Sequence, residues 1–138
     1  MNLERAFLKK EERLRKKADF DRVFKHGDVI QDPFFVVIYI DNGLPFSRIG
    51  ISVKKKFGKA HTRNRLRRLI KEIFRKNKAV FPRGYDILFI ARKELSDSFR
   101  RNEVGYHQLC EKLLKIARRI DEKQEKNGNC KKNSTEVN

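Results

Sequence analysis

The sequence contains few of the residues that build disulfide-rich or membrane-spanning proteins. Of its 138 residues only two are cysteine, Cys110 and Cys130, and none is tryptophan. Two cysteines cannot form the disulfide framework of a small secreted domain, so we expect a reduced protein. No apolar run approaches the roughly 20 residues of a membrane span, and residues 1–17 contain no apolar signal-peptide core. The sequence therefore predicts a cytoplasmic protein.

The sequence also lacks the spacings of a metal or nucleotide site. His26, His61 and His107 fall in separate predicted elements, and no Cys or His pair has the spacing of zinc ligands. There is no Gly-rich phosphate loop of the Walker type, and the acidic residues do not cluster as in a two-metal nuclease. We therefore predict no catalytic residue and no metal ligand on this chain, which alone would act as a binder.

Negative charge is scarce as well, because 35 Lys and Arg face only 18 Asp and Glu, giving a formal net charge of +17. Residues 54–78 hold twelve of these Lys and Arg and a single acid, Glu72. A surface this basic repels itself and is relieved by a polyanion, which leaves nucleic acid or an anionic membrane as partner.

The same stretch has strict helical periodicity. Leu66, Leu69, Ile70, Ile73 and Phe74 recur at the spacing of one helix face, so we expect a helix from a Thr62 N-cap to about residue 78. The opposite face carries a stripe of Asn64, Arg68, Lys71 and Arg75, flanked by Arg65 and Arg67. Guanidinium groups on a rigid helix suit bidentate phosphate contacts. Strands are predicted before and after this helix in the sequence, and the sheet they form would cover its apolar face. This disfavours binding of that face to a membrane.

The rest of the chain predicts one α+β domain with helices covering a small sheet. We expect a short helix at 18–25, strands at 34–40, 47–54 and 85–91, and a last helix from about 103 to 120. The first two strands are predicted to form an antiparallel hairpin. The order is α-β-β-(β)-α-β-α, with an optional strand in brackets. Residues 121–138 are almost devoid of apolar residues and are predicted to be a disordered tail.

Four segments of the sequence resemble the protein subunit of bacterial ribonuclease P. The main motif spans residues 54–72 and is centred on Arg63-Asn64-Arg65. Residues 20–27, 49–53 and 84–92 are similar to the family's first helix and to the strands on either side of the basic helix. The resemblance covers residues 14–120, which leaves a charged N-terminal arm at 1–13 and the tail at 121–138.

The resemblance implies a fold, an activity and partners. The family fold is ribosomal protein S5 domain 2-like, a two-layer α/β sandwich with a left-handed crossover into its last strand, against the usual right-handed rule. The activity is endonucleolytic removal of the 5′ leader of precursor tRNA. Its catalyst is the RNA subunit, so the chain itself would bind no cofactor, and Mg²⁺ would be held mainly by the RNA. The partners implied are that catalytic RNA and precursor tRNA, with no membrane and no obligate protein partner.

Site residues follow by position. The RNA-binding candidates are Lys55, Lys56, Lys59, Arg63, Asn64, Arg65, Arg67, Arg68, Lys71 and Arg75. The leader-binding candidates are Phe20 and Phe24, which a helix spacing alone assigns to the core, together with Ile38 or Tyr39. The family presents an aromatic residue on this strand, and a one-residue difference in register decides which of the two faces the leader.

Two other classes of protein remain as alternatives. A ribosomal-protein-like binder of structured RNA, with no enzymatic role, has the same charge and periodicity. A DNA-binding helix-turn-helix protein would need a short helix before the basic helix, where this sequence predicts a strand instead.

Overall fold

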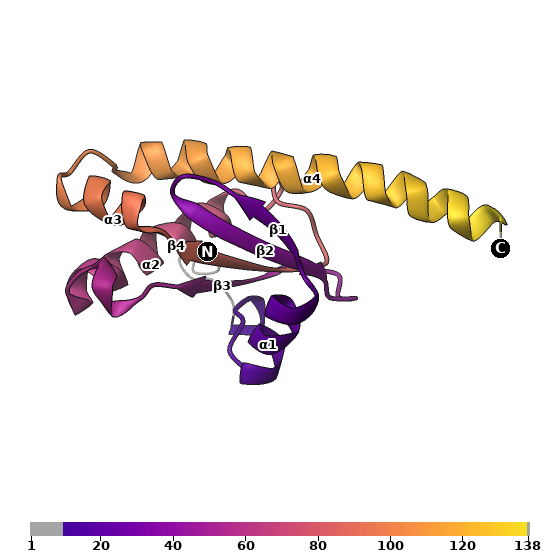
Figure 1. Cartoon of the computed structure of the whole chain (residues 1–138), viewed down its shortest axis with the longest axis horizontal. Coiled ribbons are helices and arrows are strands. Elements are labelled where there is room, and N and C mark those ends of the chain that lie inside the picture. The colour runs from indigo at the N-terminus through magenta and orange to yellow at the C-terminus, as the bar shows by residue number, and fades with distance from the viewer. Residues whose placement is uncertain (1–9, 138) are drawn as a thin grey trace, which may run out of the picture.

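The computed structural model describes residues 10–137, which form a four-stranded sheet with helices on both faces (Figure 1). Residues 1–9, most of the predicted charged arm, lie outside the described residues. The elements are η2 (Lys10–Glu12), α1 (Lys17–His26), β1 (Asp28–Gln31), β2 (Phe35–Asp41), β3 (Arg48–Ser52), η3 (Lys55–Phe57), α2 (Ala60–Lys76), β4 (Tyr85–Ala91), α3 (Lys93–Arg100) and α4 (Tyr106–Val137). The predicted α+β class is confirmed, with β1 and α3 as additions.

The last strand of the sequence, β4, occupies the interior of the sheet. The strand order is β1-β2-β4-β3, in which β4 is antiparallel to β2 and parallel to β3. The predicted hairpin of 34–40 with 47–54 is therefore wrong, because β4 lies between these two strands. Residues 87–89 have no exposed surface, and a strand that is apolar on both faces is most stable with a neighbour on each side.

The connection from β3 to β4 runs through α2 and joins the two parallel strands. A parallel pair requires such a crossover, because a tight turn can only join antiparallel strands. The left-handed crossover implied by the resemblance falls on this connection. Because α2 forms this connection, it lies across one face of the sheet and turns one side of the helix to solvent.

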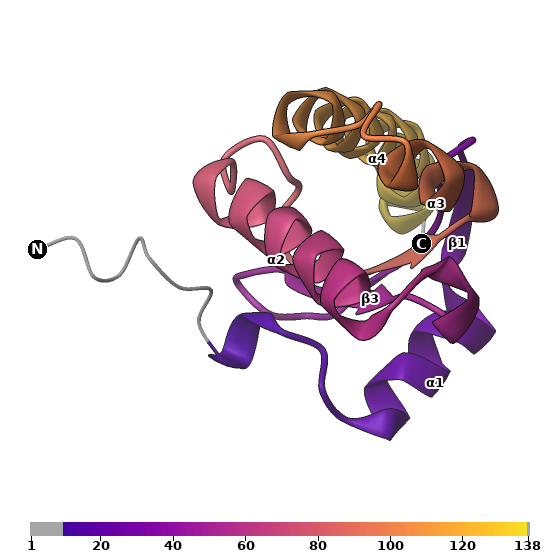
Figure 2. The ribbon, with the colours of Figure 1, turned by 90° about the vertical axis from the view of Figure 1, so that its left-hand side faces the viewer.

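The main core lies between that face and three helices. Figure 2 shows α2 and α4 next to each other over the sheet, with α1 beyond its other face. The helical side chains of this core that are fully or almost fully buried are Leu66, Ile70, Ile73, Phe74, Leu95, Phe99, Leu109, Leu113, Ile116, Ala117 and Ile120. Each contributes about 1.5–3 kcal/mol of hydrophobic burial, apart from the smaller Ala117. The periodicity that predicted the two long helices is thus the contact pattern of the core.

The other face of the sheet is covered only in part, by α1. A small cluster of Leu14, Val23, Ile38 and Leu88 is buried here. The helix sits close to the sheet, because a Cβ added to Gly50 would lie 2.9 Å from a ring carbon of Phe20. The remainder of this face stays open to solvent.

Two helical segments differ from the sequence prediction. The α3 helix was missed because it is short and shows only Leu95 and Phe99 as an apolar repeat. Residues 121–137, part of the predicted disordered tail, are helical in the structure, where α4 continues to Val137. Lys, Glu and Gln, which dominate residues 122–126, are good helix formers, and extending a helix that is already anchored costs little.

Candidate nucleic-acid interface

The basic helix α2 is held by its apolar face and begins earlier than predicted. It starts at Ala60 with Lys59 as N-cap, so Thr62 lies inside the first turn and does not cap it. Leu66, Ile70 and Ile73 have no exposed surface. Burying these side chains fixes the rotation of the helix about its axis, and that rotation directs the cationic stripe outward.

The structure brings the ten predicted RNA-binding residues together on η3, on the N-cap Lys59 and on α2. Six of them are exposed: Lys55, Lys56, Lys59, Asn64, Arg65 and Arg68. The other four are half-buried: Arg63, Arg67, Lys71 and Arg75. A ligand that reaches this surface would meet a row of donors with few acceptors between them.

Contacts within the helix orient several of these side chains. Arg63 Nε donates to the carbonyl oxygen of Gly58 at 3.1 Å, and Arg67 Nη1 donates to Asn64 Oδ1 at 3.1 Å. The guanidinium of Arg65 lies over the ring of Phe99 at 5.0 Å. Such stacking holds the planar group while leaving its N–H donors free for a phosphate.

The single acid of the stretch neutralises only one end of the stripe. Glu72 lies 3.7 Å from Arg75 and 3.9 Å from Lys76, and it forms no ion pair with Arg68 in the described part of the chain. Glu72 is 40% exposed, and ion pairs of this length near the surface are worth little. The stripe therefore keeps most of its charge available to a ligand.

One cation near the stripe comes from outside the predicted motif. The pKa of Lys71 is lowered from its ordinary value of 10.5, first by burial and then by the positive charges of Arg13 and Arg67. Arg13 lies about 60 residues away in the sequence, beside β3, and the local pattern gave no signal for it. The stripe is thus a region of unrelieved positive charge in the free protein.

This repulsion leads to a prediction for Lys71→Gln. We expect the free protein to gain about 0.5 kcal/mol of stability, a rise of roughly 2–4 °C in melting temperature, while RNA affinity falls. Because a lowered Lys pKa costs stability where the group is charged, the gain should disappear as pH rises through that pKa towards 10.5. Thermal melts at several pH values measure it. Lys76→Gln is the control, since Lys76 pairs with Glu72 and its loss should bring no gain.

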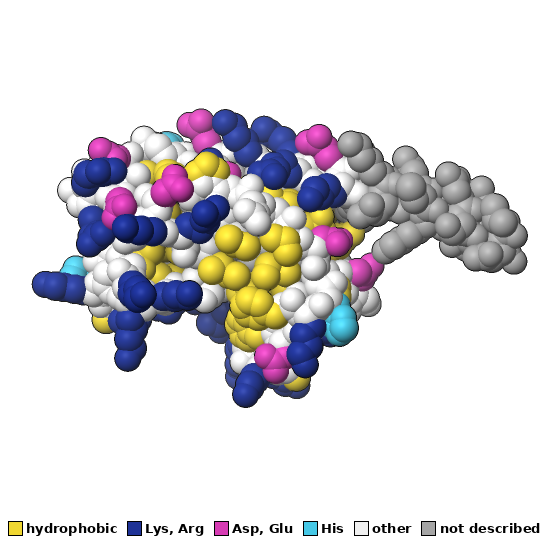
Figure 3. All heavy atoms as spheres, in the orientation of Figure 1, with side chains coloured by type: hydrophobic (Ala, Val, Ile, Leu, Met, Phe, Trp, Pro, Cys, Tyr) yellow, Lys and Arg dark blue, Asp and Glu magenta, His cyan; other side chains and the backbone are white. Residues whose placement is uncertain are grey.

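The open part of the α1 face carries an apolar patch. Phe24 is 54% exposed and Val29 45% exposed. The half-buried members of the patch are Phe20, Val36, Ile40 and Ile90. Figure 3 shows apolar side chains gathered over the sheet and α1, with Lys and Arg side chains beside them. Phe24 is therefore a surface residue, while Phe20, a half-buried member of the patch, packs against the small cluster.

The structure separates Ile38 from Tyr39. Ile38 lies on the α1 face with the small cluster, whereas Tyr39 is 2% exposed in the main core on the opposite face. The prediction that named both residues is corrected to Ile38, because successive residues of a strand point to opposite faces. No aromatic side chain of β2 therefore reaches the apolar patch.

Tyr39 gives a prediction of its own. Its hydroxyl is buried with no hydrogen-bond partner among the described residues, and burial, followed by Asp28 and Tyr85, raises its pKa to about 12. Tyr39→Phe removes this unsatisfied group and keeps the ring, so we expect about 1 kcal/mol of added stability in urea unfolding. Tyr85→Phe, at a half-buried ring 5.9 Å from Tyr39, should change little. A less stable Tyr39→Phe variant would show that the hydroxyl has a partner.

A polar network missed by the sequence analysis fixes α1 to the sheet. Asp86 on β4 has no exposed surface, and its Oδ2 accepts from Arg22 of α1 at 2.5 Å. Arg48 of β3 binds both carboxylate oxygens, at 2.8 and 2.7 Å, and Asn42 donates at 2.9 Å. Hydrogen bonding to Asp86 raises the pKa of Arg48. The three donors lie 38 to 64 residues from Asp86 in the sequence, so no local pattern identifies the network.

Neither a metal cluster nor a membrane-spanning helix occurs among the described residues. No three His, Cys, Asp or Glu side chains within them come together so as to hold a metal ion. No helix in the same part of the chain is long and apolar enough to cross a lipid bilayer.

The fold and the two surfaces together define an α+β protein built to bind nucleic acid. The family model for ribonuclease P matches residues 8–121. The chain belongs to the ribonuclease P protein family, whose role is in tRNA 5′ processing as part of an endoribonuclease complex.

Similar proteins agree with this assignment. The ribonuclease P protein component of Thermotoga maritima is 51% identical over 110 residues, covering 80% of this chain and 92% of that protein. That of Petrotoga mobilis is 44% identical over 119 residues, covering 86% and 99%. The solved ribonuclease P protein of Thermotoga maritima, 50% identical, matches 78% of this chain and 96% of its own with a TM-score of 0.73. That of Staphylococcus aureus, 33% identical, covers 80% and 94% with a TM-score of 0.66.

Proposed function

We propose that this chain binds the catalytic RNA of ribonuclease P through η3 and α2, and the 5′ leader of precursor tRNA through the apolar patch. The observation that carries the proposal is the cationic stripe on α2, held outward by the buried face of the same helix. Charge at this density, with guanidinium groups already oriented by local contacts, suits the phosphates of a folded RNA.

The apolar patch suits a single strand rather than a duplex. Phe24 leaves more than half of its surface exposed beside Val29, and unpaired bases stack on such rings whatever their sequence. The patch and α2 lie on different faces of the sheet. One protein can therefore hold the catalytic RNA and the leader at the same time.

The chemistry of cleavage is assigned to the RNA in this proposal. His61 is exposed at the start of α2, and neither a hydrogen bond nor an ion pair is found for it in the described part of the chain. We therefore interpret it as an RNA-contacting residue, while Mg²⁺ would be held mainly by the RNA. The complex would work in the cytoplasm on newly made precursor tRNA and would need no further protein.

The test compares precursor and mature tRNA on the complex assembled with Phe24→Ala. We expect precursor tRNA to bind more weakly by about 1–3 kcal/mol, the value of one base stack, and mature tRNA to bind unchanged. Assembly with the catalytic RNA should also be unchanged. The readouts are a titration with each tRNA and the cleavage rate of the precursor.

Leu44→Ala is the matched control, because Leu44 is also exposed and apolar, at 37%, but lies in the loop between β2 and β3. It should leave the binding of both precursor and mature tRNA to the assembled complex unchanged. Equal losses for both tRNAs, with a lowered melting temperature, would make Phe24 a structural residue. A chain that binds the RNA yet never supports cleavage would instead be a structural RNA binder.

A further inference from the structure

The segment before α1 is fixed along the free edge of β3. The amide of Leu14 donates to the carbonyl oxygen of Ile49 at 2.8 Å, and Arg13 forms a parallel bridge with Ile49. Glu12 pairs with Lys78, just beyond the end of α2, at 2.7 Å. Residues 10–16 therefore run along the edge of the sheet, where α2 covers one face and α1 covers the other.

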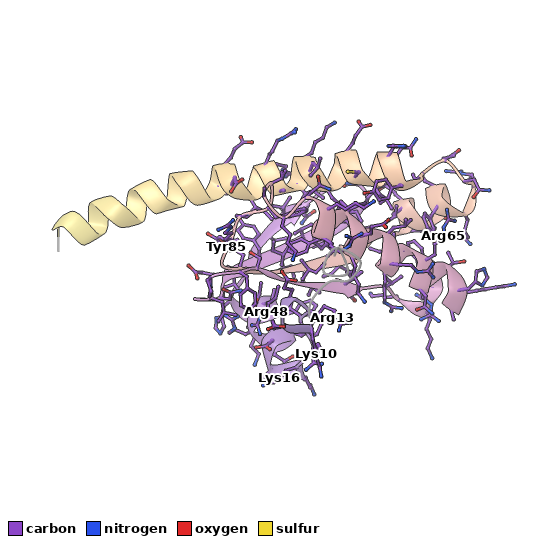
Figure 4. The ribbon with its side chains drawn as sticks, turned by 180° about the vertical axis from the view of Figure 1, so that it is seen from behind. Lys10, Arg13, Lys16, Arg48, Arg65 and Tyr85 are labelled. Atoms are coloured by element: carbon purple, nitrogen blue, oxygen red, sulfur yellow. The ribbon has the colours of Figure 1, made fainter. Side chains whose placement is uncertain are left out.

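A surface cavity of about 450 Å³ lies at this edge. Its lining residues are Lys10, Glu11, Arg13, Arg15, Lys16, Asp19, Leu44, Phe46 and Arg48. Five of these side chains are basic and two are acidic. Figure 4 shows Lys10, Arg13, Lys16 and Arg48 near one another beside α1, while Arg65 lies far off on α2.

The basic side chains of the cavity are not neutralised from within. The described residues offer no ion-pair partner to Lys10, Arg13, Arg15 or Lys16, whereas Arg48 is already bound by Asp86 and lies 3.5 Å from Asp19. The Nε of Arg13 is buried and has no hydrogen-bond partner in the described part of the chain. A buried guanidinium N–H without an acceptor is costly, and an oxygen of a phosphate would satisfy it.

The cavity also continues the stripe of α2. Arg13 lines the cavity on one side and lies close enough to Lys71 of the stripe to lower the pKa of that amine. The basic surface therefore runs from α2 around the edge of β3 to the start of α1. A chain of phosphates that follows the stripe past Lys71 would next meet Arg13 and the cavity.

We propose that this cavity is a second phosphate-binding site, which receives the backbone of the same catalytic RNA where that RNA passes around the edge of β3. The inference rests on the proposed function, since it extends the surface that binds the RNA. Lys10 and Lys16 supply exposed cations at its rim, and Arg13 supplies the buried donor. The occupant is a continuation of the strand on α2 rather than the leader, because the cavity is continuous with the stripe.

The experiment uses the double variant Lys10→Ala/Lys16→Ala and the ribonuclease P RNA of the same organism. Both side chains are exposed, so the fold should persist, and a thermal melt confirms it. We expect RNA affinity to fall about tenfold near physiological salt and the log–log salt slope to become shallower by about 1.5, the value of two phosphate contacts. The control is Lys115→Ala/Arg118→Ala on α4, which removes the same charge from exposed positions and should change the slope by less than about 0.5.

Each outcome decides the matter. Equal losses in both double variants would reduce the effect to bulk charge and overturn the proposal. Weaker binding of precursor tRNA with unchanged assembly would assign the cavity to the substrate and overturn it as well. If Arg68→Glu weakens assembly but Lys10→Ala/Lys16→Ala does not, the extension fails while the proposed function stands. If neither change weakens assembly, the proposed function itself fails.

Discussion

Replacing Asp86 with alanine is expected to lower the free energy of unfolding by about 3–5 kcal/mol. The carboxylate has no exposed surface and accepts hydrogen bonds from Arg22, Arg48 and Asn42. Removing it leaves two guanidinium groups without their anion beside a half-open apolar face. The loss should far exceed that of an exposed ion pair, because the side chains of Arg48 and Arg22, only 20% and 36% exposed, lose the buried carboxylate that compensates them.

Denaturant unfolding of the free protein measures this effect. Asp21→Ala is the matched control, since Asp21 is an exposed aspartate on α1 and its loss should cost less than about 0.5 kcal/mol. Arg22 ties α1 to the carboxylate, so the Asp86 variant should also bind precursor tRNA poorly through the apolar patch. A loss below about 1 kcal/mol would mean that water replaces the carboxylate and that the network contributes little.

The second large effect is the salt dependence of RNA binding. If the stripe makes about six phosphate contacts, the log–log slope of affinity against salt should be roughly −4 to −5. Affinity for the catalytic RNA would then fall roughly 250- to 1,000-fold between 50 and 200 mM salt. The physical reason is the release of counterions that condense on the RNA, with each phosphate neutralised adding to the slope.

Titrations at four or five salt concentrations give the slope directly. Arg68→Ala removes one exposed cation of the stripe and should make the slope shallower by about 0.7–0.9. Lys115→Ala, on α4, should leave it unchanged. A slope shallower than about −2 would show that the Lys and Arg face is not the main contact.

The helices and strands that depend on local pattern could be predicted from the sequence. The β4 strand was predicted at residues 85–91 and is observed from Tyr85 to Ala91, and the amphipathic spacing of α2 located the buried and exposed faces of that helix. Pairing between strands could not be predicted in the same way. β4 lies between β2 and β3 although it is more distant from them in sequence than they are from each other. The gain from burying β4 on both faces outweighs the local preference for a hairpin of β2 and β3.

The residues of the candidate site likewise fall into those that local sequence pattern identifies and those that only tertiary contacts identify. Its ten basic residues share one short segment, so helical spacing was enough to group them. Arg13 lies beside the stripe, and Asp86 holds α1 next to the apolar patch, only because of tertiary contacts. No local sequence signal identifies either residue. The choice between Ile38 and Tyr39 needed the register of β2, since a strand turns alternate residues to opposite faces.

The interior position of β4 has a consequence for how the protein is made. During synthesis α2 leaves the ribosome before β4, the strand that joins β3 to β2 in the sheet. Until then the nascent chain carries a strongly cationic helix whose apolar side has little to pack on, and its strands have unpaired edges. Because pairing over such sequence distances is slow, each of the two surfaces depends on a late folding step. An RNA that captured the helix early would meet a chain still able to misfold or aggregate.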